Sequence, residues 1–143
     1  MAKKLAIVFG AVFVLVGVLG FISNPIVGVG GLFLTNTTHD LVHIVFGLIL
    51  LAAGLFAPQQ SGLWLKVLGV VYLVVALLGF LMPSPLLGLI EVNSADNWLH
   101  VLLGVALLAG SMWVKDGSSM TPEGAPRGGM STSSQSPGQG STM

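Results

Sequence analysis

Histidines and acidic residues are the side chains of this sequence that can bind metal ions or transfer protons, and most of them lie in two polar stretches. His39, Asp40 and His43 lie in NTTHDLVHIVFGLILLAAG, and Asp96 and His100 lie in NSADNWLHVLLGVALLAGS. Imidazole nitrogens bind metal ions and move protons, and a neighbouring carboxylate orients the ring. Each polar stretch leads directly into an apolar segment, so the surroundings of these groups decide what they can do.

The spacing of these residues favours a structural interpretation. On a helix, His43 can meet Asp40 or His39, and His100 can meet Asp96, because residues three and four apart are neighbours. Such pairs would hold each ring in one tautomer and tie a loop to the helices. Polar residues in membrane bundles often serve packing, so this interpretation is preferred over a binding site.

Two alternatives remain open for the histidines. A metal ion or haem could bind to His39, His43 and His100, since imidazole suits zinc, copper and iron, although no HExxH pattern is present. Transport or proton relay is the other alternative, since ionisable groups in membrane segments are functional candidates. The expectation is therefore no cofactor, with a metal or haem as the alternative. Without a G-x-S-x-G, P-loop or Rossmann fingerprint, we expect no enzymatic activity.

Helix initiation explains the other polar residues. Thr38 and Ser94 are the expected N-caps, and an aspartate follows two residues later, where the helix dipole favours negative charge. Together these residues are expected to cap two helices and to form a polar rim at the outer face of the membrane. The assigned residues are Asn36, Thr38, Asp40, Asn93, Ser94, Asp96 and Asn97.

The composition places most of the chain in lipid. Of 143 residues, 54% are hydrophobic and 7% are charged, whereas soluble domains carry about 25% charged residues. The formal net charge is zero, which argues against nucleic acid as a partner. The absence of cysteine excludes disulfides, thiolate nucleophiles and iron–sulfur clusters.

Four apolar runs predict four transmembrane helices. A bilayer core needs about 20 helical residues, and the runs show no apolar/polar alternation that would indicate a barrel. We expect a transmembrane domain over 1–116. Residues 117–143 are rich in Gly, Ser, Pro and Thr and are predicted to be a disordered tail. The predicted helices span about 5–22, 39–57, 63–82 and 96–114.

The sequence also contains an internal match. GAVFVLVGVLGF (Gly10–Phe21) aligns with GVVYLVVALLGF (Gly69–Phe80), and the two polar stretches align with each other. This pattern predicts two tandem helical hairpins, related by a pseudo-twofold axis along the membrane normal. A segment that recurs as the third helix is unlike a cleaved signal peptide.

Small residues recur seven positions apart in each predicted helix, close to two helical turns. Because small residues let helix backbones approach closely in lipid, this spacing predicts a packed four-helix bundle. The pairs are Gly10 and Gly17, Gly47 and Gly54, Gly69 and Ala76, and Gly104 and Ser111.

The distribution of basic residues predicts the orientation. All five fall on one side of a four-crossing arrangement: Lys3, Lys4, Lys66, Lys115 and Arg127. The positive-inside rule makes that side cytoplasmic. We therefore expect a multi-pass protein of the inner membrane with both termini in the cytoplasm and the histidines near the outer face. The expected partners are the lipid bilayer and either further copies of the chain or a larger membrane complex.

The doubled pattern resembles a family of small bacterial four-helix membrane proteins known only as a domain of unknown function. The matching features are GVVYLVVALLGF, N-S-x-D-N-x-x-H-x-x-x-G at Asn93–Gly104 and N-T-x-H-D-x-x-H-x-x-x-G at Asn36–Gly47. The resemblance covers about residues 5–114 and implies a fold, a membrane location and a bacterial-type origin, but no reaction or ligand. One departure is that His39 stands where the second copy has Asp96. The expected function is a structural or accessory bundle.

Overall fold

Long helices make up most of residues 1–112, the part of the chain that the computed structural model describes. The predicted all-α class is confirmed, and this part of the chain contains isolated β-bridges but no strand. The predicted tail, 117–143, lies outside the described residues. The elements are α1 (Ala2–Leu19), α2 (Thr37–Phe56), the short 3-10 helix η1 (Pro58–Gln60), α3 (Ser61–Leu81) and α4 (Ser94–Met112).

The helix bounds differ from the predicted bounds by a few residues. The first helix ends at Leu19, three residues before the end of the apolar run, because the chain turns there into a loop. Asn24 stabilises this turn: its side-chain amide donates to the Leu19 carbonyl at 2.9 Å. The other three helices begin two residues earlier than predicted, at Thr37, Ser61 and Ser94, because the residues just before each apolar run join its first turn.

All four helices are long and apolar enough to cross a membrane. Their outer faces carry large aliphatic side chains, among them Leu48, Leu77 and Leu102, which are 54%, 57% and 65% exposed. Apolar surface on this scale requires a nonaqueous environment or a partner. The chain is therefore a multi-pass membrane protein.

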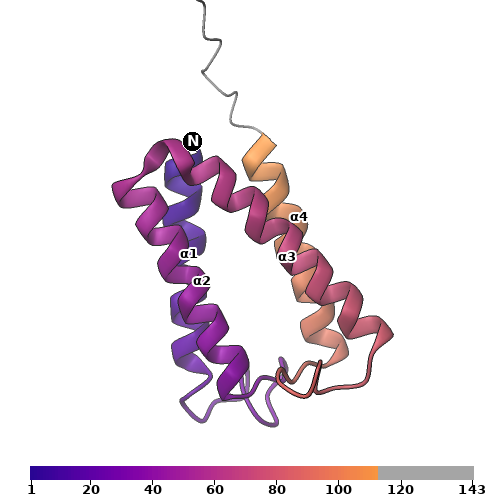
Figure 1. Cartoon of the computed structure of the whole chain (residues 1–143). Helices are drawn as coiled ribbons and strands as arrows, with labels where there is room; N and C mark the ends of the chain where they lie inside the picture. The colour runs from indigo at the N-terminus through magenta and orange to yellow at the C-terminus, as the bar shows by residue number, and fades with distance from the viewer. Residues whose placement is uncertain (113–143) are drawn as a thin grey trace, which may run out of the picture.

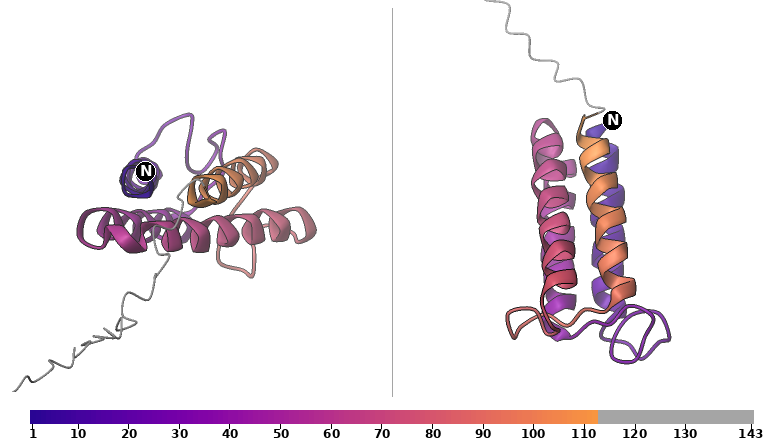
Figure 2. Two further views of the ribbon diagram at one scale, coloured as in Figure 1. Left: turned by 90° about the horizontal axis from the view of Figure 1, so that it is seen from above. Right: turned by 90° about the vertical axis from the view of Figure 1, so that its right-hand side faces the viewer.

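The helices pair as α1 with α2 and α3 with α4, along most of their lengths. We call α1 and α2 the first hairpin and α3 and α4 the second hairpin. Seen end-on, α1 and α4 lie in one layer and α2 and α3 in the other (Figure 2). The two long loops lie at one end of the bundle, and the start of α1 and the end of α4 lie at the other (Figure 1). The pseudo-twofold repeat that would relate the two hairpins stays a prediction.

Glycines set the close approach within each hairpin. A Cβ added to Gly10 would lie 2.8 Å from the carbonyl oxygen of Gly47, and one added to Gly69 would lie 3.0 Å from that of Gly104. At these distances the helix backbones are nearly in contact, which only glycine permits. The predicted role of the small-residue pattern in packing is confirmed at these positions.

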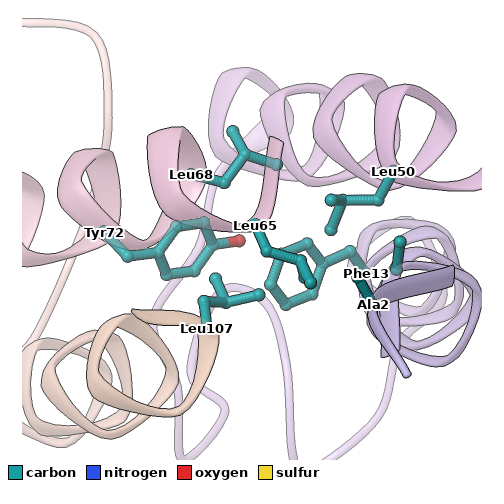
Figure 3. Packing of buried hydrophobic residues seen from close by; sticks show 8 residues of the cluster. Ala2, Phe13, Leu50, Leu65, Leu68, Tyr72 and Leu107 are labelled. Carbon is teal, nitrogen blue, oxygen red and sulfur yellow. The ribbon is translucent and has the colours of Figure 1, made fainter. Parts of the chain in front are cut away.

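The two hairpins meet in an apolar core built around two aromatic rings. Phe13 stacks on Tyr72 with ring centroids 5.0 Å apart and an interplanar angle of 13°. Leu50, Leu65 and Leu107 are fully buried around this stack (Figure 3). The Tyr72 ring also contacts His100, at a centroid distance of 5.0 Å. The core therefore supports the polar residues directly.

Candidate functional site: a buried histidine cluster between the hairpins

Asparagines cap the two helices that carry the histidines. The Asn36 side-chain oxygen accepts from the backbone N–H three residues on at 3.0 Å, and Asn93 does the same at 2.9 Å. This corrects the prediction that Thr38 and Ser94 are the N-caps. Asn36 is extended (φ −125°, ψ 173°), so its side chain can reach back over the first turn, whereas Thr38 is already helical.

The same asparagines join the two hairpins. The Asn36 side-chain amide donates to the Leu89 carbonyl at 2.9 Å, and the Asn93 amide donates to the Leu32 carbonyl at 2.9 Å. Each helix start is thus bonded to the loop of the opposite hairpin. These two bonds tie the starts of α2 and α4 to the opposite loops, and thereby place the residues of their first two turns.

Those turns bring all three histidines together. His39, His43 and His100 are buried, and one ring nitrogen of each lies within 4.8 Å of the others. The rings of His39 and His43 stack at a centroid distance of 4.8 Å, and His100 lies 5.5 Å from His39 and 6.0 Å from His43. We call these three residues the histidine cluster. Both hairpins contribute to it.

Backbone carbonyls set the tautomers of two rings. His39 Nδ1 lies 2.8 Å from the Glu91 carbonyl oxygen, and His100 Nδ1 lies 2.8 Å from the Asp96 carbonyl oxygen. A carbonyl only accepts, so each Nδ1 donates its proton, and Nε2 of a neutral ring keeps a lone pair. His43 Nδ1 is buried and has no hydrogen-bond partner within residues 1–112.

Asp96 is the carboxylate of the site. Its Oδ2 lies 3.2 Å from His100 Nδ1, the helical pair that the sequence predicted, and 4.0 Å from His39 Nε2. His39 occupies the position in the first hairpin that Asp96 occupies in the second, so the two unlike residues face each other. A carboxylate beside a ring N–H orients that ring.

The remaining predicted rim residues take different places. Asn36, Asn93, Thr38 and Ser94 lie at the end of the bundle, whereas Asp40, Asp96 and Asn97 are buried inside it. The sequence predicted either Asp40 or His39 as the partner of His43. In the structure, the His43 ring stacks on the His39 ring.

Asp40 and Asn97 each pack against a glycine of the same hairpin, Gly20 just after α1 and Gly79 in α3. A Cβ on Gly20 would overlap the Asp40 carboxylate, and a Cβ on Gly79 would overlap the Asn97 amide.

A cavity of about 190 Å³ lies between α1 and α4, beside the histidine cluster. Its walls are mainly apolar and include Phe13 and Leu103, and it is also lined by His43, Asp96 and His100. A pocket of only about 20 Å³ lies between α2 and α3 on the other side of the cluster, where Phe46 and Tyr72 fill the space. The cluster therefore has one open side and one filled side.

Two residues of the site were not predicted from the sequence. Tyr72 packs against the cluster, and Thr35 lines the larger cavity. Tyr72 had a usable signal, because it is the only tyrosine of the chain and lies inside an apolar run where the matching residue is Phe13. Thr35 had none, because it precedes the motif and depends on the course of the loop.

The fold and the site together define a class: a multi-pass membrane protein with two packed helical hairpins and a buried polar cluster where they meet. Residues 3–113 match the family described as Domain of unknown function (DUF4383), and the chain belongs to that family. No curated protein and no solved structure matches the chain.

Proposed function

We propose that the histidine cluster binds one divalent transition-metal ion, of the zinc or copper type, inside the membrane domain. The observation that carries this proposal is the convergence of three buried imidazoles from both hairpins, with one ring nitrogen of each within 4.8 Å. The role is binding, and we propose no catalysis. The ligands would be His39, His43 and His100.

The hydrogen bonds support metal binding over a purely structural role. Metal-ligating histidines commonly donate the other ring N–H to a backbone carbonyl or a carboxylate. His39 and His100 do so through Nδ1, which leaves Nε2 for the ion. A structural role explains those two bonds but leaves His43 Nδ1 without a partner. An unpaired buried polar atom is costly, and coordination would remove this cost.

The distances suit a small ion. In a tetrahedral site with zinc–nitrogen bonds of about 2.1 Å, the ligand nitrogens lie about 3.4 Å apart. The separations within 4.8 Å therefore close with side-chain shifts of about 1 Å around the ion. A haem does not suit the space, since pockets for larger organic ligands measure about 300–1,000 Å³, and the cavity beside the cluster measures about 190 Å³.

We also propose the inner membrane as the location, with both termini in the cytoplasm. Lys3, Lys4 and Lys66 lie near the end of the bundle opposite the histidine cluster, in the first turn of α1 and the second turn of α3. The positive-inside rule favours that end as cytoplasmic, which leaves the cluster near the outer face. Reporter fusions at the N-terminus and in the loop after α3 test this orientation, and equal activity of a cytoplasm-specific reporter at both sites would contradict it.

The metal site is tested on full-length protein purified in detergent, stripped with chelator and titrated with Zn²⁺ or Cu²⁺. We expect one ion per chain by elemental analysis, and a higher melting temperature because a ligand that binds the folded state stabilises it. His43→Ala should lose the ion. A matched control is Asp40→Asn, which gives this position the amide that Asn97 supplies in the second hairpin.

The control should bind the ion as the unchanged protein does. If the stripped protein takes up no stoichiometric ion, or if His43→Ala binds it as well as the control does, the histidine cluster is structural.

A further inference from the structure

We infer that the 190 Å³ cavity between α1 and α4 binds a small lipid-soluble molecule that consists of an aromatic ring and one hydroxyl group. This inference goes beyond the proposed metal site and does not require a bound ion. It assigns the open side of the histidine cluster a ligand of defined chemical class, a simple phenol.

The volume and walls of the cavity set the size of the ligand. A cavity of about 150 Å³ lined by aliphatic and aromatic side chains stays dry and binds benzene. The cavity here is somewhat larger, at about 190 Å³, and apolar side chains such as Val16, Leu19 and Leu99 make up most of its lining. One six-membered ring with a small substituent therefore fills it.

Two buried polar atoms in the cavity wall favour a hydroxyl group on that ring. Thr35 Oγ1 lies beside the Asp40 carboxyl group and Asp96 Oδ2 lies 3.2 Å from His100 Nδ1, yet neither atom makes a hydrogen bond of full geometry in the described part of the chain. A carboxylate oxygen accepts, and a threonine hydroxyl both donates and accepts. A ligand hydroxyl can donate to Asp96 Oδ2 and accept from Thr35 Oγ1, which gives both atoms a well-aligned hydrogen bond.

The ligand would enter from the bilayer. Val12 and Ile26 line the cavity and are also 43% and 53% exposed, so the mouth of the cavity lies on the apolar outer surface. The helices that border it, α1 and α4, make few direct contacts with each other. A molecule dissolved in lipid reaches this mouth without crossing a polar layer.

The small pocket between α2 and α3 supports a ligand-binding role for the larger cavity between α1 and α4. The position of Leu103 in α4 corresponds to Phe46 in α2, and that of Phe13 corresponds to Tyr72. The pocket lined by the larger residues, Phe46 and Tyr72, measures about 20 Å³. The same framework is thus able to close this space with larger side chains, yet the side that carries Thr35 and Asp96 stays open.

Binding of 4-fluorophenol, followed by ¹⁹F NMR, tests the inference on the full chain in phosphatidylcholine nanodiscs, with empty nanodiscs as background. Fluorobenzene serves as the probe without a hydroxyl. We expect saturable binding of 4-fluorophenol, about tenfold tighter than that of fluorobenzene, as one added hydrogen bond would give. The experiment uses chelator-treated protein whose metal content is measured, so that failure of this inference and failure of the proposed metal site are separate results.

Variants locate the site. Leu103→Phe should weaken binding of both probes about tenfold or more, because it reduces the cavity volume, whereas Phe46→Leu should leave the affinity for 4-fluorophenol unchanged. Thr35→Val keeps the shape but removes the hydroxyl, so it should lower the affinity for 4-fluorophenol towards that for fluorobenzene. Equal affinity for the two probes in the unchanged protein, no saturable binding, or binding insensitive to both Leu103→Phe and Thr35→Val would overturn the inference.

Discussion

Within the first and the second hairpin, matching contacts hold the two helices together. The two hairpins differ, however, in the residues that line the interface between them. In each hairpin a glycine of one helix lies against a glycine of the other, Gly10 against Gly47 and Gly69 against Gly104. At the interface between the hairpins, Phe13 faces Tyr72, and the cavity of about 190 Å³ between α1 and α4 has a counterpart of about 20 Å³ between α2 and α3.

This comparison separates two kinds of position. The glycines and capping asparagines are the same in both hairpins because they set backbone geometry, and both hairpins need the same geometry. His39 and Asp96 differ, and they face each other at 4.0 Å across the interface. The proposed metal site would use this difference, with His39 as a ligand and Asp96 as an orienting carboxylate.

The glycine contacts should give the largest effect on stability, and they should not be equal. A Cβ at Gly10 would lie 2.8 Å from two backbone atoms, whereas at Gly69 the nearest atom, also at 2.8 Å, belongs to the Leu108 side chain, which can move. We expect Gly10→Ala to cost about 3 kcal/mol and Gly69→Ala about 1 kcal/mol. Unfolding of the purified protein in detergent, followed by circular dichroism, measures both.

Gly62→Ala is the matched control for these variants, because a Cβ there would meet no atom within 4 Å. It should be neutral or should stabilise α3 by up to about 1 kcal/mol, as alanine favours a helix over glycine. Equal losses for Gly10→Ala and Gly69→Ala would show that the two hairpins pack with equal tightness, against the comparison.

Substitutions at His39 and Asp96, the matching positions that differ between the hairpins, should give the next largest effect, which is on metal affinity. His39→Asp removes one proposed ligand, and we expect the affinity for Zn²⁺ or Cu²⁺ to fall by more than about 100-fold. This loss is larger than the loss of up to about 100-fold that follows when a residue hydrogen-bonded to a metal ligand is removed. Asp96→His keeps all three ligands and adds an imidazole, so it should bind the ion with a loss of at most about 100-fold. Isothermal titration of stripped protein in detergent measures both constants, and equal losses in the two variants would remove the distinction between ligand and orienting residue.

Replacing the capping asparagines should give smaller effects that are equal in the two hairpins. Asn36→Ala and Asn93→Ala each remove a helix cap and a bond to the opposite loop, worth about 1 kcal/mol each. We expect each variant to lose about 2 kcal/mol of unfolding free energy. Asn36→Asp keeps the cap but not the amide donor, so it should lose about half as much. A large difference between Asn36→Ala and Asn93→Ala would show that one loop contact dominates.

The transmembrane helices were predicted from the sequence more accurately than the arrangement of the histidine cluster. Apolar runs and glycine spacing determine which segments cross a membrane and which faces pack, because both depend on local periodicity. The cap at Asn36 was misassigned by two residues, since a threonine and an asparagine are both good caps and only the loop conformation decides between them. The convergence of His39 and His100 depends on how the two hairpins meet, which local periodicity does not determine.

The smallest predicted effect concerns the aromatic stack, and it tests whether the tyrosine serves packing alone. Phe13 and Tyr72 occupy matching positions and stack at 5.0 Å, so Tyr72→Phe makes the two hairpins alike while it keeps the ring contact. No hydrogen bond of the Tyr72 hydroxyl occurs among the described residues, so its loss should change the unfolding free energy by no more than about 0.5 kcal/mol. Tyr72→Ala is the contrast, because it removes the buried ring itself and its contacts with Phe13. Thermal unfolding of both variants, with and without bound metal, makes the measurement. A loss of metal affinity in Tyr72→Phe at unchanged stability would assign the tyrosine hydroxyl to the metal site. The difference between Phe13 and Tyr72 would then serve metal binding, as the difference between His39 and Asp96 is proposed to do.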